Sequence, residues 1–139
     1  MTEATQERKA QQRPLSPHLQ IYKPQITSAT SIFHRMTGVI LAGGLLLVTW
    51  GLVSLATGAE SFGYFTGFMG SLLGRLIMFG WTLAFFYHLC SGMRHLIMDT
   101  GKLLEIDKAY KAAYVVYGLT LVLTILAWAC FYAMRGTNG

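Results

Sequence analysis

The side chain with the clearest capacity for chemistry is His88, which stands inside the apolar run from Trp81 to Gly92. An ionisable group in such a run is costly to bury and usually has a partner or a ligand. Neutral imidazole is a common ligand of haem iron, but a hydrogen bond to a neighbouring helix would also satisfy it. Gly92 follows His88 by one helical turn and allows either a flat macrocycle or a second helix to approach closely. These residues alone leave both interpretations open.

A second polar group follows on the same predicted helix. His95 comes seven residues after His88, close to two full helical turns, so both side chains share one face. Arg94 is its neighbour. A b-type haem carries two propionates, and a basic cluster one or two turns from an iron ligand would neutralise them. Alternatively, Arg94 and His95 extend toward lipid headgroups, with Asp99 as a partner.

The segment TSATSIFHRMTG, from Thr27 to Gly38, holds a different combination of groups. If it is helical, Thr27, Ser31 and Arg35 follow one another at i+4 steps on one face, with His34 adjacent. A hydroxyl and a guanidinium placed in this way can donate hydrogen bonds to the carbonyl of a quinone head group. The alternative is a helix N-cap followed by a basic anchor at the membrane surface.

The elements that must position these groups are long apolar helices. Hydrophobic residues form 53% of the 139-residue chain and charged residues only 12%, against roughly a quarter charged in an average soluble domain. Three stretches, at about 36–57, 72–98 and 112–134, are long enough to cross a hydrocarbon layer of about 30 Å. We therefore predict an all-α integral membrane protein with three transmembrane helices. Residues 1–26 would form an N-terminal arm, and residues 27–139 a three-helix membrane domain.

The distribution of basic residues predicts the orientation. The second connection holds Lys102, Lys108 and Lys111, whereas the first has no Lys or Arg before Arg75. By the positive-inside tendency, the second connection and the basic N-terminal arm lie on the cytoplasmic or matrix side, and the C-terminus lies outside. The basic residues flank apolar stretches and form no stripe with interleaved aromatics, so the predicted partner is the lipid bilayer and not nucleic acid.

Two motifs resemble those of a known family. Residues 13–38 have the sequence RPLSPHLQIYKPQITSATSIFHRMTG, and residues 88–99 have the sequence HLCSGMRHLIMD. The first matches the pattern RP-x-SPH-L-x-IY followed by S-I-x-H-R-x-TG, and the second matches H-x3-G-x-RH-x3-D. Together with the three spans, these motifs make nearly the whole chain similar to the cytochrome b subunits of succinate dehydrogenase, the membrane anchors of respiratory Complex II. The arm most resembles the alphaproteobacterial and mitochondrial branch.

The resemblance implies how the cofactor is held. In the family, the histidine at the position of His88 is an axial ligand of haem b, and a second membrane anchor subunit supplies the other axial histidine. The resemblance places His34 and Arg35 near the haem propionates. His95 matches the motif and is a further cofactor-binding candidate, whose role the resemblance leaves open.

The resemblance also implies the function. Ser31 and Arg35 would lie at the ubiquinone site, with Ile32 lining it. Succinate would be oxidised at a flavin in a flavoprotein subunit, and electrons would pass through an iron–sulfur subunit to ubiquinone at the membrane boundary. This chain has no dinucleotide-binding glycine fingerprint, and its two cysteines match no cluster spacing. The expected location is the bacterial inner membrane, or the mitochondrial inner membrane in a eukaryote.

Three alternatives remain. A haem-free structural anchor would not require His88. A small transporter would usually carry an intramembrane acidic residue, which the predicted spans lack. A fumarate reductase anchor would look similar and work in the reverse direction, which depends on redox potentials and on the type of quinone.

Overall fold

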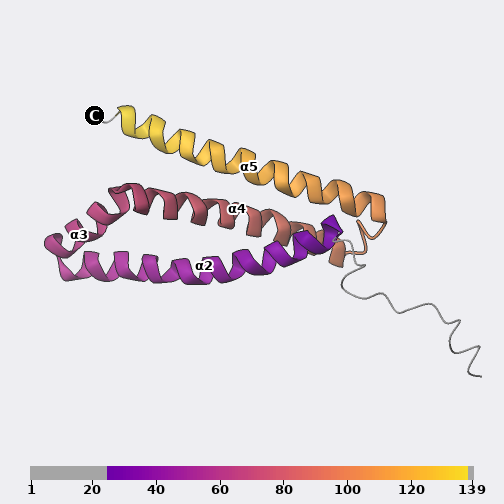
Figure 1. Ribbon diagram of the computed structural model, residues 1–139, viewed down its shortest axis with the longest axis horizontal. Helices are drawn as coiled ribbons and strands as arrows, with labels where there is room; N and C mark the ends of the chain where they lie inside the picture. The colour runs from indigo at the N-terminus through magenta and orange to yellow at the C-terminus, as the bar shows by residue number, and fades with distance from the viewer. Residues whose placement is uncertain (1–24, 138–139) are drawn as a thin grey trace, which may run out of the picture.

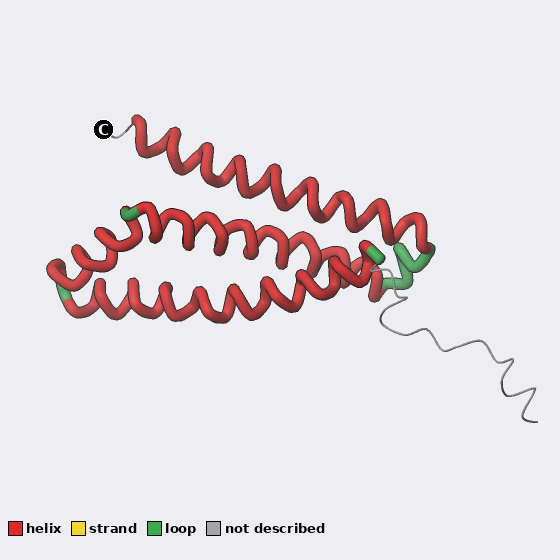
Figure 2. Tube along the Cα trace, in the orientation of Figure 1, coloured by secondary structure: helices red, strands yellow, loops and turns green. Residues whose placement is uncertain are grey.

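The computed structural model describes residues 25–137, and this part of the chain is built from α-helices (Figures 1 and 2). They are α2 (Ile26–Thr57), α3 (Ala59–Gly70), α4 (Leu72–Asp99) and α5 (Ile106–Thr137). No strand occurs between residues 25 and 137. The prediction of an all-α fold is confirmed. Most of the predicted N-terminal arm lies outside the described residues, and Ile26 already belongs to α2.

Three of the helices, α2, α4 and α5, are long and apolar enough to cross a membrane. This confirms the predicted three-span protein. Helix α2 has 32 residues, or about 48 Å at 1.5 Å per residue, which exceeds the hydrocarbon thickness of about 30 Å. It begins ten residues before the predicted span at residue 36, so the segment from Thr27 to Gly38 is helical. Its first turns can therefore lie at the membrane surface.

The first connection, between the spans predicted at about 36–57 and 72–98, contains the short helix α3. Gly58 separates α2 from α3 with a φ of 132°, which a residue with a side chain rarely adopts. Ser71 then caps the N-terminus of α4, because its hydroxyl accepts a hydrogen bond from the Gly74 backbone N–H at 3.1 Å. With 12 residues, α3 is too short to span a bilayer.

Helix α4 packs between α2 and α5 (Figure 1). The contact with α5 includes the aromatic pairs Phe79–Trp128 and Tyr87–Tyr117. The buried positions on α5 are small: Ala109, Ala113, Val116, Thr120 and Thr124. The two threonine hydroxyls donate to backbone carbonyls within α5 at 2.7 Å, so they carry no unsatisfied donor into the interface. Small residues are the usual way for membrane helices to approach closely, since lipid gives little hydrophobic drive for helix association.

The contact with α2 also depends on small residues. A Cβ atom at Gly44 would overlap the indole of Trp81 on α4. Long apolar side chains mostly point outward, and Val39, Leu46 and Ile106 are each 74% exposed. In water such a surface would be unfavourable. It is suited to lipid or to other membrane subunits.

Candidate functional site

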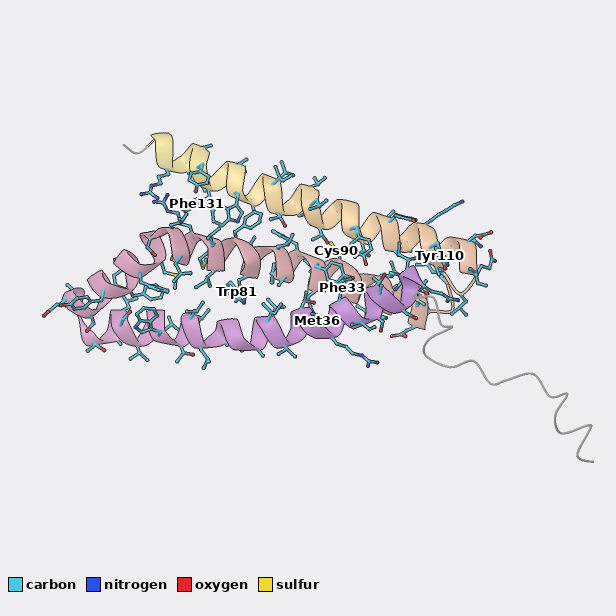
Figure 3. The ribbon with its side chains drawn as sticks, in the orientation of Figure 1. Phe33, Met36, Trp81, Cys90, Tyr110 and Phe131 are labelled. Atoms are coloured by element: carbon cyan, nitrogen blue, oxygen red, sulfur yellow. The ribbon has the colours of Figure 1, made fainter. Side chains whose placement is uncertain are left out.

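Three histidines meet where the first turns of α2 cross the second half of α4. The rings of His34 and His88 stack with centroids 4.0 Å apart and planes inclined by 13°. His95 lies with its ring centroid 5.1 Å from that of His34. Figure 3 labels Phe33 and Met36, neighbours of His34, where α2 approaches α4. The structure therefore joins His34 of one sequence motif to the two histidines of the other.

Hydrogen bonds fix the orientation of the His88 ring. Its Nδ1 lies 3.1 Å from the backbone carbonyl oxygen of His34 and 3.2 Å from the Thr37 hydroxyl. The hydroxyl of Thr37 can itself donate to the Phe33 carbonyl at 2.9 Å. Because a carbonyl oxygen only accepts, we assign the proton to Nδ1, which leaves a lone pair on Nε2. This is the arrangement found in metal-binding histidines, whose second nitrogen donates to a neighbouring group.

Two glycines allow the helices to come this close. A Cβ at Gly38 would stand 3.2 Å from Cε1 of His88, which is tighter than nearly all real Cβ contacts. A Cβ at Gly92 would stand 3.6 Å from Cε1 of His34, an ordinary contact distance. Of the two uses expected for Gly92, the described chain shows the approach of a second helix.

Arg94 is buried on a different face of α4 from the histidines. It is 4% exposed and shares its face with the buried residues Tyr87 and Ser91. The Tyr87 hydroxyl donates to the Thr30 carbonyl at 3.1 Å, which ties this face to α2. The interpretation that Arg94 extends to the headgroups does not fit this burial. The expected cluster of Arg94 with His95 is correspondingly split between two faces.

Four buried polar atoms have no hydrogen-bond partner among residues 25–137. They are Nδ1 of His34, Nε1 of Trp81, Oγ of Ser91 and Nε of Arg94. Leaving such groups unpaired costs about 1–3 kcal/mol each, and more for charged groups. The described part of the chain thus presents donors suited to an acidic ligand or to a partner subunit.

The predicted quinone-binding residues lie on the first turns of α2. Ser31 is half-buried, Arg35 is exposed, and Ile32 is 57% exposed. The neighbouring Thr30 hydroxyl donates to the Ile26 carbonyl at 2.6 Å. No such bond occupies the Ser31 hydroxyl among the described residues, so it remains available to a ligand. The structure places Ser31 and Arg35 one turn apart, beside His34.

Sequence reasoning missed Thr37 and Tyr87, which connect α2 to α4. Both are polar residues within apolar helices and lie next to the histidine motifs, and this is the sequence feature that could have identified them.

Among residues 25–137, no group of three or more His, Cys, Asp or Glu side chains is arranged to hold a metal ion.

Comparison with known proteins identifies the family. A family model described as the succinate dehydrogenase/fumarate reductase transmembrane subunit matches residues 9–127. The chain is 40% identical over 120 residues to the succinate dehydrogenase cytochrome b556 subunit of Paracoccus denitrificans, which covers 86% of this chain and 92% of that protein. It is 40% identical over 124 residues to the cytochrome b560 subunit of Reclinomonas americana, covering 86% of each. The chain therefore belongs to the succinate dehydrogenase/fumarate reductase transmembrane subunit family.

Proposed function

We propose that this chain is the cytochrome b membrane subunit of a succinate:ubiquinone oxidoreductase. In that role it anchors a flavoprotein subunit and an iron–sulfur subunit to the membrane. It binds haem b together with a second membrane anchor subunit and forms part of the ubiquinone site. The names of the relatives support the membrane-subunit role, and the observation that carries the haem assignment is the His88 ring, whose Nδ1 is held by the His34 carbonyl.

His88 would hold the haem iron, because its Nε2 keeps a lone pair while its ring is held between two helices. His34 is not suited to be the opposite ligand. Two imidazoles that hold one metal ion between them need room for that ion and for two bonds of about 2 Å each. The centroids of His34 and His88 are 4.0 Å apart in a face-to-face stack. A stack this close leaves no room for an ion between the rings, so the second histidine that would hold the haem is expected from the other anchor subunit.

The hydrogen-bond donors around His88 fit the propionate groups of a haem. Nδ1 of His34 and Nε of Arg94 are buried without partners among the described residues, and His95 lies beside His34. We assign His34, His95 and Arg35 to the haem propionates, whereas Arg94 is buried on the neighbouring face of α4 with Tyr87 and Ser91. When bound, haem b supplies a one-electron redox centre. The residues of this chain orient the cofactor and balance its charge.

The ubiquinone assignment rests on Ser31, Ile32 and Arg35. The first turns of α2 extend beyond the charge-free part of the helix that begins at Met36. A soluble partner can therefore approach them. Two electrons and two protons convert ubiquinone to ubiquinol, and negative charge develops on its oxygens as electrons arrive. The Ser31 hydroxyl and the Arg35 guanidinium would donate to such an oxygen, while Ile32 would contact the apolar ring.

The assignment of His88 as a haem ligand can be tested by absorption spectroscopy of a variant. In the purified complex, His88→Ala should remove or alter the low-spin b-type bands of the reduced-minus-oxidised spectrum while the chain stays in the membrane. Cys90→Ala is the matched control, because Cys90 is half-buried on the same helix and has no assigned role. An unchanged spectrum and midpoint potential in His88→Ala would reject the ligand assignment. A wild-type complex without a b-type spectrum would favour the haem-free anchor.

The proposed orientation places the N-terminus on the cytoplasmic or matrix side of a bacterial inner or mitochondrial inner membrane. We expect Lys102→Cys and Gly136→Cys, each made in a chain lacking Cys90 and Cys130, to react with a membrane-impermeant thiol reagent from opposite sides. Labelling of both positions from one side would refute this topology.

A further inference from the structure

A cavity of about 610 Å³ lies at the end of the bundle opposite the histidines. All four described helices line it, mostly with apolar side chains such as Leu47, Phe65, Met78 and Trp128. Its volume falls within the roughly 300–1,000 Å³ typical of sites for small organic molecules. Figure 3 shows Phe131, another lining residue, on α5 at this end and on the side toward α4.

The cavity also has two cationic side chains and no acidic one among its lining residues. Arg75 stands in the first turn of α4, and Arg135 in the last turn of α5. Neither forms an ion pair with any other residue between 25 and 137. The hydroxyls of Thr66 and Thr82 also line the cavity, but they donate to the Phe62 and Met78 carbonyls. The donors left to bind a ligand are therefore the two guanidinium groups and the indole N–H of Trp81, which is buried without a partner among the described residues.

The position of these arginines is not explained by membrane orientation. They lie at the end opposite the connection that holds Lys102, Lys108 and Lys111, and no other Lys or Arg of residues 25–137 lies on their side. Basic residues that serve as topology signals gather on the inner side. Both residues are also arginines, whose planar fork matches phosphate oxygens in a bidentate manner.

We propose that this cavity binds an anionic phospholipid, with its phosphate between Arg75 and Arg135 and an acyl chain along the apolar wall. A neutral quinone head group would carry no charge to pair with the two exposed guanidinium groups. An anionic headgroup provides the opposite charge at the membrane surface, and its chain fits the lining. This assignment uses residues far from the proposed haem and quinone sites and does not depend on either.

The test uses the whole purified complex, delipidated in a neutral detergent and titrated with phosphatidylglycerol or with phosphatidylcholine. Native mass spectrometry counts the lipids bound and gives their apparent affinities. We expect one phosphatidylglycerol to bind saturably and in preference to phosphatidylcholine. Because a basic residue near the membrane surface contributes about fivefold to the binding of anionic lipid, that preference should fall by about tenfold or more in the double variant R75Q/R135Q.

Matched variants separate the site from general charge and packing effects. Lys102→Gln removes a cation from the opposite end and should leave the preference unchanged. Gly70→Phe should weaken binding of both lipids, because Gly70 lines the cavity and has open space where a Cβ would stand. Gly63→Phe is its control on α3, since it also has open space but does not line the cavity.

Several results would overturn the proposal. One is equal affinity of the wild-type complex for the two lipids, a measurement that needs no variant to assemble. Others are an unchanged preference in R75Q/R135Q and displacement of the lipid by a ubiquinone analogue at comparable concentration. Competition by inorganic phosphate as strong as that by phosphatidylglycerol would indicate a site for a free anion instead.

Discussion

The two ends of the helix bundle are built in opposite ways. At the histidine end, α2 and α4 are close enough for Nδ1 of His88 to contact a backbone carbonyl of the other helix. At the arginine end, the same helices and their neighbours surround a cavity lined by bulky side chains, with Arg75 and Arg135 included. The close approach of α2 and α4 at the histidine end fixes the positions of polar side chains. The wider spacing of the helices at the arginine end leaves room for a flexible apolar ligand.

Glycine accounts for part of this difference. At the histidine end, Gly38 and Gly92 each face an imidazole ring of the opposite helix. At the arginine end, Gly63, Gly67 and Gly70 of α3 have no neighbouring atom within 4 Å of a built Cβ. The three glycines of α3 are therefore open to substitution. Close packing at glycine also occurs at the arginine end, because a Cβ at Gly51 would stand 2.9 Å from the Phe65 ring and one at Gly74 would overlap the Phe68 carbonyl.

The largest effect should come from the proposed quinone-binding groups at the histidine end. Ser31→Ala and Arg35→Leu should each lower succinate:ubiquinone reductase activity by about tenfold or more, because a preset donor to a developing negative charge is lost. Succinate oxidation by an artificial dye that accepts electrons upstream should change little. Arg35→Lys should restore activity only in part, since the ammonium group lacks the planar fork.

The two activities, measured on the same preparation, form the internal control for this prediction. Normal rate and apparent affinity for ubiquinone in both assembled variants would show that Ser31 and Arg35 have a structural role. The proposed haem site would then be the one functional site left at the histidine end.

The next largest effect should come from filling the space between α2 and α4. Gly44→Leu should destabilise the assembled complex by about 1–3 kcal/mol or block its assembly, because the indole of Trp81 occupies the position of the new side chain. Gly43→Leu is the control, since nothing lies within 4 Å of a Cβ built there. Thermal inactivation of the purified complex measures both, and equal effects would show that the Gly44 contact is not specific.

A smaller effect is expected from the group that orients the proposed haem ligand. Thr37→Val removes the hydroxyl 3.2 Å from Nδ1 of His88, but the His34 carbonyl remains as an acceptor. Haem should be retained with a shifted midpoint potential and an affinity lowered by about tenfold. Thr49→Val is the control, because that hydroxyl also bonds a carbonyl within α2, at 2.8 Å, and contacts no histidine. Identical redox titrations of the two variants would show that the Thr37 hydroxyl does not orient the His88 ring.

The sequence predicted the spans well because the bilayer requires long uncharged segments, and such segments can be recognised without knowledge of packing. The shared face of His88 and His95 followed from helix periodicity alone. The stacking of His34 on His88 did not, because these residues are separated by 54 positions. No local pattern gives the register between two membrane helices.

The burial of Arg94 was missed for a related reason. Periodicity places it on a different face from His88, but it does not show which face of α4 packs against another helix. That depends on small residues distant in sequence, such as Ala109 and Ala113 on α5. The start of α2 was likewise placed at Met36 because charge was used to bound the span, whereas the helix continues through polar residues to Ile26.

The smallest effect is expected for the ion pair in the Lys-rich connection. Lys108 and Glu105 are joined at 3.0 Å, but their side chains are 59% and 71% exposed. Solvent screens such a pair, and ordering two long side chains opposes it, so Lys108→Gln should change stability by less than about 0.5 kcal/mol. Thermal inactivation of the complex in low and high salt measures this, with Lys111→Gln as the control. Lys108 lies near the same end of the bundle as the histidines. A small effect of Lys108→Gln would therefore show that polar contacts at this end matter for stability only when they are buried. A salt-insensitive loss of 1 kcal/mol or more would instead mean that a partner subunit covers this loop.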